Sequence, residues 1–464
     1  MIRRTMKFFD ERLGASRFVR SSLDKVFPDH YAFLLGEIAL YCFVVLIGTG
    51  IFLTFFFNAS STEVVYHGDY HPLVGATVSD AFRSTLDISF SVRAGLVMRQ
   101  IHHWAALVFI AAIVAHLCRV FFSGAFRKPR ELNWMIGVTM LILAIFNGFS
   151  GYSLPDDLLS GTGLRIAFSI AQSIPLVGTW IAFLVFGGEF PSHRIIGRLF
   201  VTHTLIVPAL LVALISVHLA MVWRQKHTQF PGDGHTEDTV EGPKLWPTYA
   251  LKSLGLFFAV AATLCLLGGL FQINPIWLYG PYHASQVSSP AQPDWYMGWL
   301  EGALRLFPPW EIRAFGFEIP NPFFPAVALA GLTFLGLYVW PFLESWATTD
   351  RSEHHLLSRP RDHPFRSALG AATLSFYAVL FFAASNDLLA KWLKIPVTRV
   401  TVFFQVAVFV VPVVVFLVVR RLLRALAGSG APRFSEVPLA AVSPGRTGRR
   451  ARRRSGRSPT RTRG

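Results

Sequence analysis

Four histidines lie in two long apolar segments of this 464-residue chain, at nearly the same spacing in each. His102 and His116 are 14 residues apart, and His203 and His218 are 15 residues apart. At about 100° per residue, these intervals return to within about 40° and 60° of the starting direction, so each pair lies on one face of its helix. The helical rise separates the two members by about 21–22 Å. Two sites stacked in a hydrocarbon core about 30 Å thick would have this spacing.

Two histidines that meet from facing helices at one depth can bind a six-coordinate haem iron through their imidazole nitrogens. A zinc ion would need closer or more numerous ligands. His103 is turned about 140° from His116, so we expect His102 to be the ligand and His103 to pack or to lie at the interface. Core histidines bonded to the backbone are the alternative, although unpaired polar groups in lipid are costly.

Arginines and glycines accompany these histidines. Arg99 lies three residues before His102 and Arg119 three residues after His116, where a haem propionate would point; snorkelling at the ends of membrane spans is the alternative. Glycines recur at the same 14-residue period in two other apolar segments, namely Gly36, Gly50, Gly137 and Gly151. Glycine would allow the backbone to approach a flat macrocycle closely, although membrane helices also use glycine for packing.

The composition predicts the elements that must position these residues. Hydrophobic residues make up 53% of the chain and charged residues only 15%, which is typical of an all-α, polytopic membrane protein. Eight segments are apolar and long enough to span a bilayer, namely 32–57, 96–123, 134–152, 197–223, 249–271, 322–343, 366–385 and 401–420.

A ninth apolar segment, 164–190, is broken by Pro175, Gly178 and the Gly187–Gly188 pair. With eight spans, the basic segments 127–131, 224–227 and 351–366 all fall on one side of the membrane, as the positive-inside rule requires. We therefore interpret 164–190 as interfacial helices on the outer face. Both termini are then cytoplasmic.

We divide the chain into five parts. They are an amphipathic N-terminal segment (1–30), a four-helix bundle for two haems (31–225), a cytoplasmic linker (226–248), a C-terminal domain of four spans (249–425) with a long outer loop at 272–321, and a basic tail (426–464). We expect the tail to be disordered and to contact anionic lipid; a dispensable solvated tail is the alternative. We expect no nucleic acid among the partners. Three isolated cysteines exclude a disulfide framework.

Further motifs connect these residues with a known family. The four histidines, the four glycines, "GYSLPDD" (151–157) and "PDWY" (293–296) together resemble cytochrome b of the quinol:cytochrome c oxidoreductases, over roughly residues 28–420. The stretch "SGAFRKPRELNW" (123–134) and the 15-residue second spacing are similar to the chloroplast and Gram-positive branch. The chloroplast form is split in two, so this continuous chain most closely resembles the actinobacterial type of subunit.

The resemblance implies an enzyme subunit in a bacterial cell membrane. It would oxidise quinol at the outer face, pass electrons through two non-covalent b-type haems, reduce quinone at the inner face and translocate protons. His102 and His203 would hold the low-potential haem near the outer face, and His116 and His218 the high-potential haem near the cytoplasm. The implied partners are a Rieske iron–sulfur subunit and a cytochrome c-type subunit in a homodimeric complex, with a terminal oxidase as a further candidate.

Asp294, Tyr296 and Tyr152 are the candidates for quinol oxidation. The family usually has Glu at position 294, and Asp reaches one carbon less far; capping of a helix that begins at Trp295 is the alternative role.

At the inner face, Trp223 and Ser253 stand where relatives that use ubiquinone commonly have His and Asp. The second of these positions follows Lys252. The two departures favour menaquinone and a different set of proton donors.

Two other functions remain open from the sequence. One is a di-haem membrane anchor of a dehydrogenase, or a ferric reductase, against which the "PDWY" loop and the last three spans argue. The other is a transporter without a cofactor that uses its histidines as a proton relay. Such a transporter would be colourless, and it would leave the matched histidine and glycine spacings unexplained.

Overall fold

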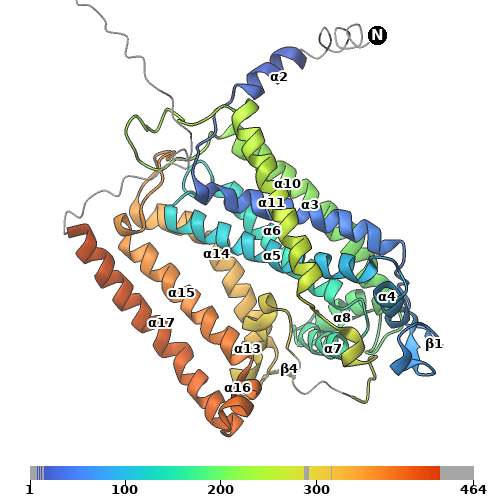
Figure 1. Cartoon of the computed structure of the whole chain (residues 1–464). Coiled ribbons are helices and arrows are strands. Elements are labelled where there is room, and N and C mark those ends of the chain that lie inside the picture. The colour runs from blue at the N-terminus through green and yellow to red at the C-terminus, as the bar shows by residue number, and fades with distance from the viewer. Residues whose placement is uncertain are drawn as a thin grey trace, which may run out of the picture.

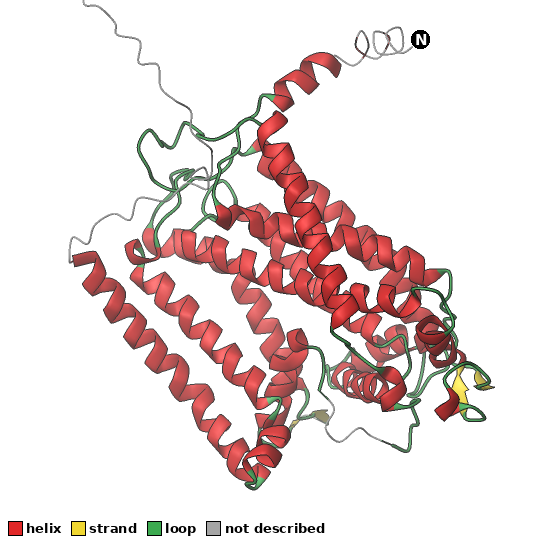
Figure 2. Cartoon of the chain, viewed as in Figure 1, coloured by secondary structure: helices red, strands yellow, loops and turns green. Residues whose placement is uncertain are grey.

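The structure, a computed structural model, describes residues 8, 10, 12, 15–286, 292–314 and 316–428. Within these ranges the chain is dominated by helices, and the strands are confined to two short hairpins (Figure 2). From residue 429 on, the predicted disordered tail lies outside the described residues.

Within the described residues, eight helices are long and apolar enough to cross a membrane, which confirms the predicted number. With the turns that extend them, they are Tyr31–Thr54, Gly95–Ser123, Glu131–Tyr152, Ile195–Arg224, Leu245–Leu270, Phe323–Thr348, Pro364–Ala383 and Val397–Ala427. The interrupted segment 164–190 forms α7 (Leu158–Gln172) and α8 (Gly178–Phe186), both shorter than the roughly 20 residues that a span needs.

The first four spans and the fifth pack into one bundle. Helix α5 (Gly95–Ser123) packs along α3 (Leu34–Thr54) and against α11 (Ala250–Leu270), and α6 (Glu131–Tyr152) packs against α10 (Val207–Arg224). Buried apolar side chains from all five helices form a single cluster. The bundle is therefore held mainly by apolar packing, with the polar groups of the candidate site as the exceptions.

A second group of helices flanks the bundle. Helix α15 (Pro364–Ala383) lies along α17 (Val397–Gly428) and against α13 (Gly298–Leu306), while α14 (Leu329–Thr348) contacts α6 (Figure 1). The remaining described elements are α2 (Ala15–Leu23), η1 (Tyr31–Phe33), β1 (Glu63–Val65), η2 (His71–Leu73), β2 (Thr77–Ser79), α4 (Asp80–Phe90), α9 (Ile195–Val201), η3 (Thr202–Ile206), η4 (Leu245–Tyr249), α12 (Ile276–Tyr279), η5 (Trp295–Met297), β3 (Ile312–Ala314), β4 (Phe317–Ile319), η6 (Phe323–Ala328), η7 (Pro360–Asp362) and α16 (Asn386–Leu393).

The two ends of the bundle carry different structures. Helices α4, α7 and α8 and the antiparallel β1–β2 hairpin gather at one end, and α2 lies at the other (Figure 1). We call these the outer and inner ends, after the orientation predicted from the sequence. The described part of the long outer loop (272–321) contains α12, η5, α13 and the antiparallel β3–β4 hairpin.

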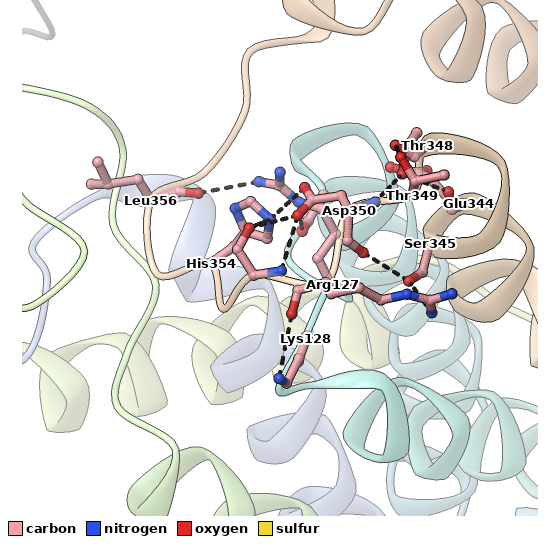
Figure 3. Close-up of polar contacts among 12 residues, drawn as sticks. Arg127, Lys128, Glu344, Ser345, Thr348, Thr349, Asp350, His354 and Leu356 are labelled. Carbon is pink, nitrogen blue, oxygen red and sulfur yellow. Dashed lines mark hydrogen bonds and ion pairs between the residues drawn. The ribbon is translucent and has the colours of Figure 1, made fainter.

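Three inner loops that are far apart in the sequence meet in a cluster that we call the loop clasp, formed by 127–130, 225–229 and 350–358. The guanidinium of Arg130, only 8% exposed, donates to the carbonyls of His354 at 2.7 Å and Lys226 at 3.0 Å. Figure 3 shows the neighbouring contacts, in which Arg127 reaches Leu356 and Lys128 reaches the 350–354 segment. The clasp joins the N-terminal bundle to the loop between α14 and α15.

Candidate functional site

The structure brings the four histidines together in the predicted pairs. His102 on α5 faces His203 with ring centroids 6.1 Å apart, and His116 faces His218 on α10 at 6.5 Å. The two rings of each pair are inclined by 73°. The two pairs thus have nearly the same geometry at two levels of one bundle.

The unequal spacings have a local cause that regular helix geometry did not predict. His203 lies in η3, a π-helical turn over Thr202–Ile206 between α9 and α10. A π turn accommodates one residue more than an α-helical turn, and such turns are frequent at functional sites. With one residue absorbed in this turn, about 14 regular steps separate the two histidines of the fourth span, so their offset is about 40°, as for the pair on α5, and not about 60°.

The two rings of each pair are spaced so that one metal ion could bind an imidazole nitrogen from each of them. Bonds of about 2 Å from a metal to each imidazole nitrogen, plus a ring radius of roughly 1.1 Å on each side, would place the centroids about 6.2 Å apart. In the outer pair, His102 Nδ1 lies 2.9 Å from Thr49 Oγ1 and His203 Nδ1 lies 2.9 Å from the Asn147 carbonyl oxygen. These contacts occupy Nδ1 and leave Nε2 for a metal. Neither Thr49 nor Asn147 was found from the sequence.

Three of the four predicted glycines lie against histidine rings. A Cβ atom would meet His116 Cε1 at 3.2 Å from Gly36, His102 Cε1 at 3.2 Å from Gly50, and His203 Cε1 at 2.3 Å from Gly151. A Cβ on Gly137 would meet nothing within 4 Å among the described residues. The lack of a side chain at Gly36, Gly50 and Gly151 therefore makes room for the histidine rings, whereas Gly137 faces open space.

The two arginines have buried nitrogen atoms with no protein acceptor. Arg99 Nη2 donates to the Asn274 carbonyl at 2.9 Å, but its Nε has no hydrogen-bond partner among the described residues. The same holds for Nε and Nη2 of Arg119, whose guanidinium lies 4.3 Å from the centre of the Phe33 ring. Unpaired buried donors of this kind are costly, and the carboxylates of a haem would satisfy them.

A cavity of about 490 Å³ surrounds the outer histidine pair. His102, His203, Gly50 and Gly151 line it, and Arg99 lies at its wall. The volume falls within the range of about 300–1,000 Å³ that is usual for ligand and cofactor sites.

Asp294 connects this cavity with the outer loop. Its Oδ1 lies 2.9 Å from His103 Nε2, and its Oδ2 accepts a hydrogen bond from the Tyr296 hydroxyl at 3.1 Å. The expectation that His103 only packs or lies at the interface was therefore incomplete. Asp294 makes no capping bond to the turn at Trp295, which argues against the capping alternative.

Tyr296 is a second buried polar group at this point, with only 3% of its surface exposed. Burial and the adjacent Asp294 carboxylate raise the pKa of its hydroxyl well above the usual value. The phenol therefore stays protonated at neutral pH and continues to donate to Asp294. A Cβ on Gly148 would lie 2.5 Å from the Tyr296 oxygen, so the absence of a side chain at this position makes room for the hydroxyl.

A second cavity of about 360 Å³ adjoins the first, and both are lined by Tyr152, Asp294 and Tyr296. The rest of its wall is mostly apolar and comes from α6, α7, α8 and α13, including Phe149, Leu164 and Leu300. The three candidate residues for quinol oxidation thus lie between the histidine cavity and an apolar slot. Such a slot suits a flat, apolar molecule that exchanges protons at one end.

The two acids after "GYSLP" differ from this group. Asp157 is fully buried and caps α7, accepting hydrogen bonds from the backbone of Leu159 at 3.0 Å and Ser160 at 3.3 Å. Burial raises its pKa to about 6. The contacts of Asp157 therefore support a capping role.

Comparisons with known proteins show which family the chain resembles. Residues 107–281 match the family model described as Cytochrome b(N-terminal)/b6/petB. Proteins named cytochrome bc1 complex cytochrome b subunit are similar over most of the chain. One from Mycobacterium tuberculosis is 51% identical over 422 residues, covering 91% of this chain and 77% of the relative, and one from Streptomyces coelicolor is 48% identical over 419 residues, covering 90% and 77%.

A solved structure titled Hyperthermophilic respiratory Complex III matches with a TM-score of 0.66 and 21% identity. The match covers 90% of this chain and 98% of that one. At this level of identity, the match supports the fold alone.

Proposed function

The chain belongs to the family of cytochrome b subunits of actinobacterial cytochrome bc1 complexes, and from this membership we propose its reaction in detail. It oxidises quinol at the outer end, passes electrons along the two histidine pairs and reduces quinone at the inner end, with proton release outside and uptake inside. Membership of the family implies electron transport, b-type haem and a location in the membrane.

One observation carries the proposal. Two histidine pairs with ring centroids 6.1 and 6.5 Å apart lie at two levels of one bundle, and the outer pair opens onto a cavity that shares Asp294 and Tyr296 with an apolar slot. This arrangement supports two haems, one per pair, beside a quinol site at the outer end. A proton relay without a cofactor would need neither the open cavity between His102 and His203 nor the glycines beside the rings.

In quinol oxidation, Asp294 would accept a proton, and His103 and Tyr296 would hold its carboxylate in position. The quinol head would enter the apolar slot beside Tyr152 and give a proton to the Asp294 carboxylate. His103 and Tyr296 hold the two oxygens of that carboxylate from opposite sides, which fixes a side chain one carbon shorter than the family's usual Glu. A general base must lie within hydrogen-bond reach of the proton that it takes, and the lining of the slot places Asp294 at its wall.

When bound, the haems would supply single-electron transfer across the membrane. His102 and His203 would hold the outer haem and His116 and His218 the inner one, with Arg99 and Arg119 directed at their carboxylates. The orphaned nitrogens of both arginines support this role.

We propose a Rieske protein and a cytochrome c-type subunit as partners in a homodimeric complex, with menaquinone as the quinone and a terminal oxidase as a further partner. The absence of the His and Asp typical of ubiquinone sites supports menaquinone. The basic inner loops support cytoplasmic termini.

The test is a dithionite-reduced minus oxidised optical spectrum of the purified chain, with haem quantified per polypeptide. Two haems per chain are expected, and His203→Leu and His218→Leu should each lose one of them. Folded protein without haem would favour the transporter. Two haems with quinol oxidation that does not depend on the Rieske protein would favour a dehydrogenase anchor or ferric reductase.

A further inference from the structure

A second polar cluster lies at the inner ends of α3 and α11. The Glu37 carboxylate on α3 accepts hydrogen bonds from the hydroxyls of Ser253 and Tyr249, and from Tyr41 at 3.3 Å. Tyr41 and Ser253 also contact each other through their hydroxyl oxygens. Three hydroxyls thus surround one carboxylate between two membrane-spanning helices, far more polar contact than helix packing in lipid requires.

This cluster lies next to the inner histidine pair. Gly36, the residue before Glu37, is the glycine whose added Cβ would lie 3.2 Å from His116 Cε1. One turn earlier, the Phe33 ring lies under the guanidinium of Arg119. Glu37 therefore directly follows Gly36, the residue of α3 that lies against the ring of His116.

The cluster also connects with the inner surface. Lys252, the neighbour of Ser253, forms an ion pair with Asp29, and these side chains are 48% and 29% exposed. Ser253 and Tyr249, which donate to Glu37, lie one residue after and three residues before Lys252 in the same span. The Phe27 ring stacks on Tyr249 at 4.4 Å.

The cluster accounts for the departure from the family pattern. Relatives that use ubiquinone carry an Asp at the position of Ser253, so a carboxylate is missing from the fifth span here. Glu37 supplies a carboxylate from the first span, and the Ser253 hydroxyl donates to it. A carboxylate on the facing helix α3 thus contacts the position of α11 at which those relatives carry one.

We propose that Glu37 is the proton donor for quinone reduction at the inner end. The inference rests on the proposed function, because quinone must receive two electrons from the inner side of the bundle and two protons from the cytoplasm to become quinol. Water at the inner surface first protonates the Glu37 carboxylate along Tyr249 and Ser253. The new Glu37 O–H bond then breaks as an O–H bond forms on a quinone carbonyl oxygen, and the second proton follows the same route.

The test compares Glu37→Gln with Glu353→Gln in the complete complex with its partner subunits and haems. Glu353 is an exposed acid on an inner loop, so its replacement is a matched control. Loss of a positioned proton donor costs roughly 10²- to 10⁴-fold. In Glu37→Gln, reoxidation of the inner haem by quinone should therefore slow by roughly a hundredfold. Reduction of the haems from the outer site should keep its rate.

A second readout separates proton transfer from a structural tie between helices. Redox-induced infrared difference spectra should show a protonated-carboxyl band that Glu37→Gln removes and that Glu37→Asp shifts. If Glu37 only joins α3 to α11, Gln keeps part of the hydrogen bonding through its amide oxygen, reoxidation is unchanged and the band persists, which overturns the inference.

Two further outcomes are also decisive. Should the Gln variant fail to retain haem, an unchanged carboxyl band in Glu37→Asp overturns the inference as well. A wild-type complex whose haems are not reduced by quinol would refute the proposed function itself, and the inference would fall with it.

Discussion

Replacement of Gly151 by Ala should remove the outer haem and leave the inner one in place. An alanine Cβ would lie 2.3 Å from His203 Cε1 and 2.8 Å from both ring nitrogens. Ordinary van der Waals contact begins near 3.4 Å, so the ring must move by roughly 1 Å. A functional side chain tolerates a displacement of only about 0.5 Å before its geometry is lost.

The energetic cost follows from the same contact. Overpacking by one methyl group typically costs about 1–3 kcal/mol, and the moving ring also strains the 2.9 Å contact between His203 Nδ1 and the Asn147 carbonyl. Rotation of the His203 ring away from His102 would relieve most of this steric overlap. We therefore expect the change to appear mainly as lost ligation, with a smaller loss of thermal stability.

The assay is haem content per chain together with the reduced minus oxidised spectrum, in variants purified side by side. Gly151→Ala should hold about one haem, and Gly50→Ala should show a milder loss, because its Cβ would meet His102 at 3.2 Å. Gly255→Ala is the control, since its Cβ would meet nothing within 4 Å among the described residues. Full occupancy and an unaltered spectrum in Gly151→Ala would refute the reasoning that Gly151 makes room for a ligand.

Three further outcomes follow from the structure. Asp294→Asn should slow quinol oxidation by about 10²- to 10⁴-fold while both haems remain, and an unchanged turnover rate would exclude Asp294 as the proton acceptor. Burial raises the pKa of Asp157 to about 6, so the folded protein holds the Asp157 proton more tightly than the unfolded chain does. The free energy of unfolding should therefore be highest below about pH 4 and fall by about 3 kcal/mol as the pH rises through 6. Asp157→Asn should lack this loss, and unfolding midpoints at pH 4.5 and 7.5 in both proteins will show whether it does. Glu344→Gln breaks a 2.7 Å pair with Arg366, of which only 3% is exposed, and should lower the free energy of unfolding by about 3–5 kcal/mol, whereas a denaturation midpoint equal to that of the wild type would contradict the burial argument.

The sequence predicts the membrane spans and the face of the helix that carries His102 and His116, because the signals for both are local. Twenty-residue apolar runs specify the spans, and the interval from His102 to His116 places both rings on one face of a regular helix. The π turn at His203 could not be derived in this way, because the same residues would also form an ordinary α-helix. Only the packing of this helix against its neighbours distinguishes the two forms.

Contacts between segments that are far apart in the sequence could not be predicted either. The direction of His103 on α5 carries no information on the outer loop, which brings Asp294 to 2.9 Å from the His103 ring. Glu37 and Ser253 are 216 residues apart, and neither is unusual in its own helix. Such pairs become visible only when the helices are placed in space.

The loop clasp has a consequence for the continuity of the chain. Gln229 bonds through its backbone to His355 at 3.0 Å and Leu357 at 2.8 Å, and Arg130 holds His354 from the other side. A break in the polypeptide within residues 231–240 would leave Arg130 and Gln229 on one fragment and 354–357 on the other. The two fragments would carry complementary surfaces, and non-covalent reassembly could replace the peptide bond. Glu237, within this connection, also accepts hydrogen bonds from the backbone of His355 and Leu356, so a cut that spares these contacts would leave the two halves in register.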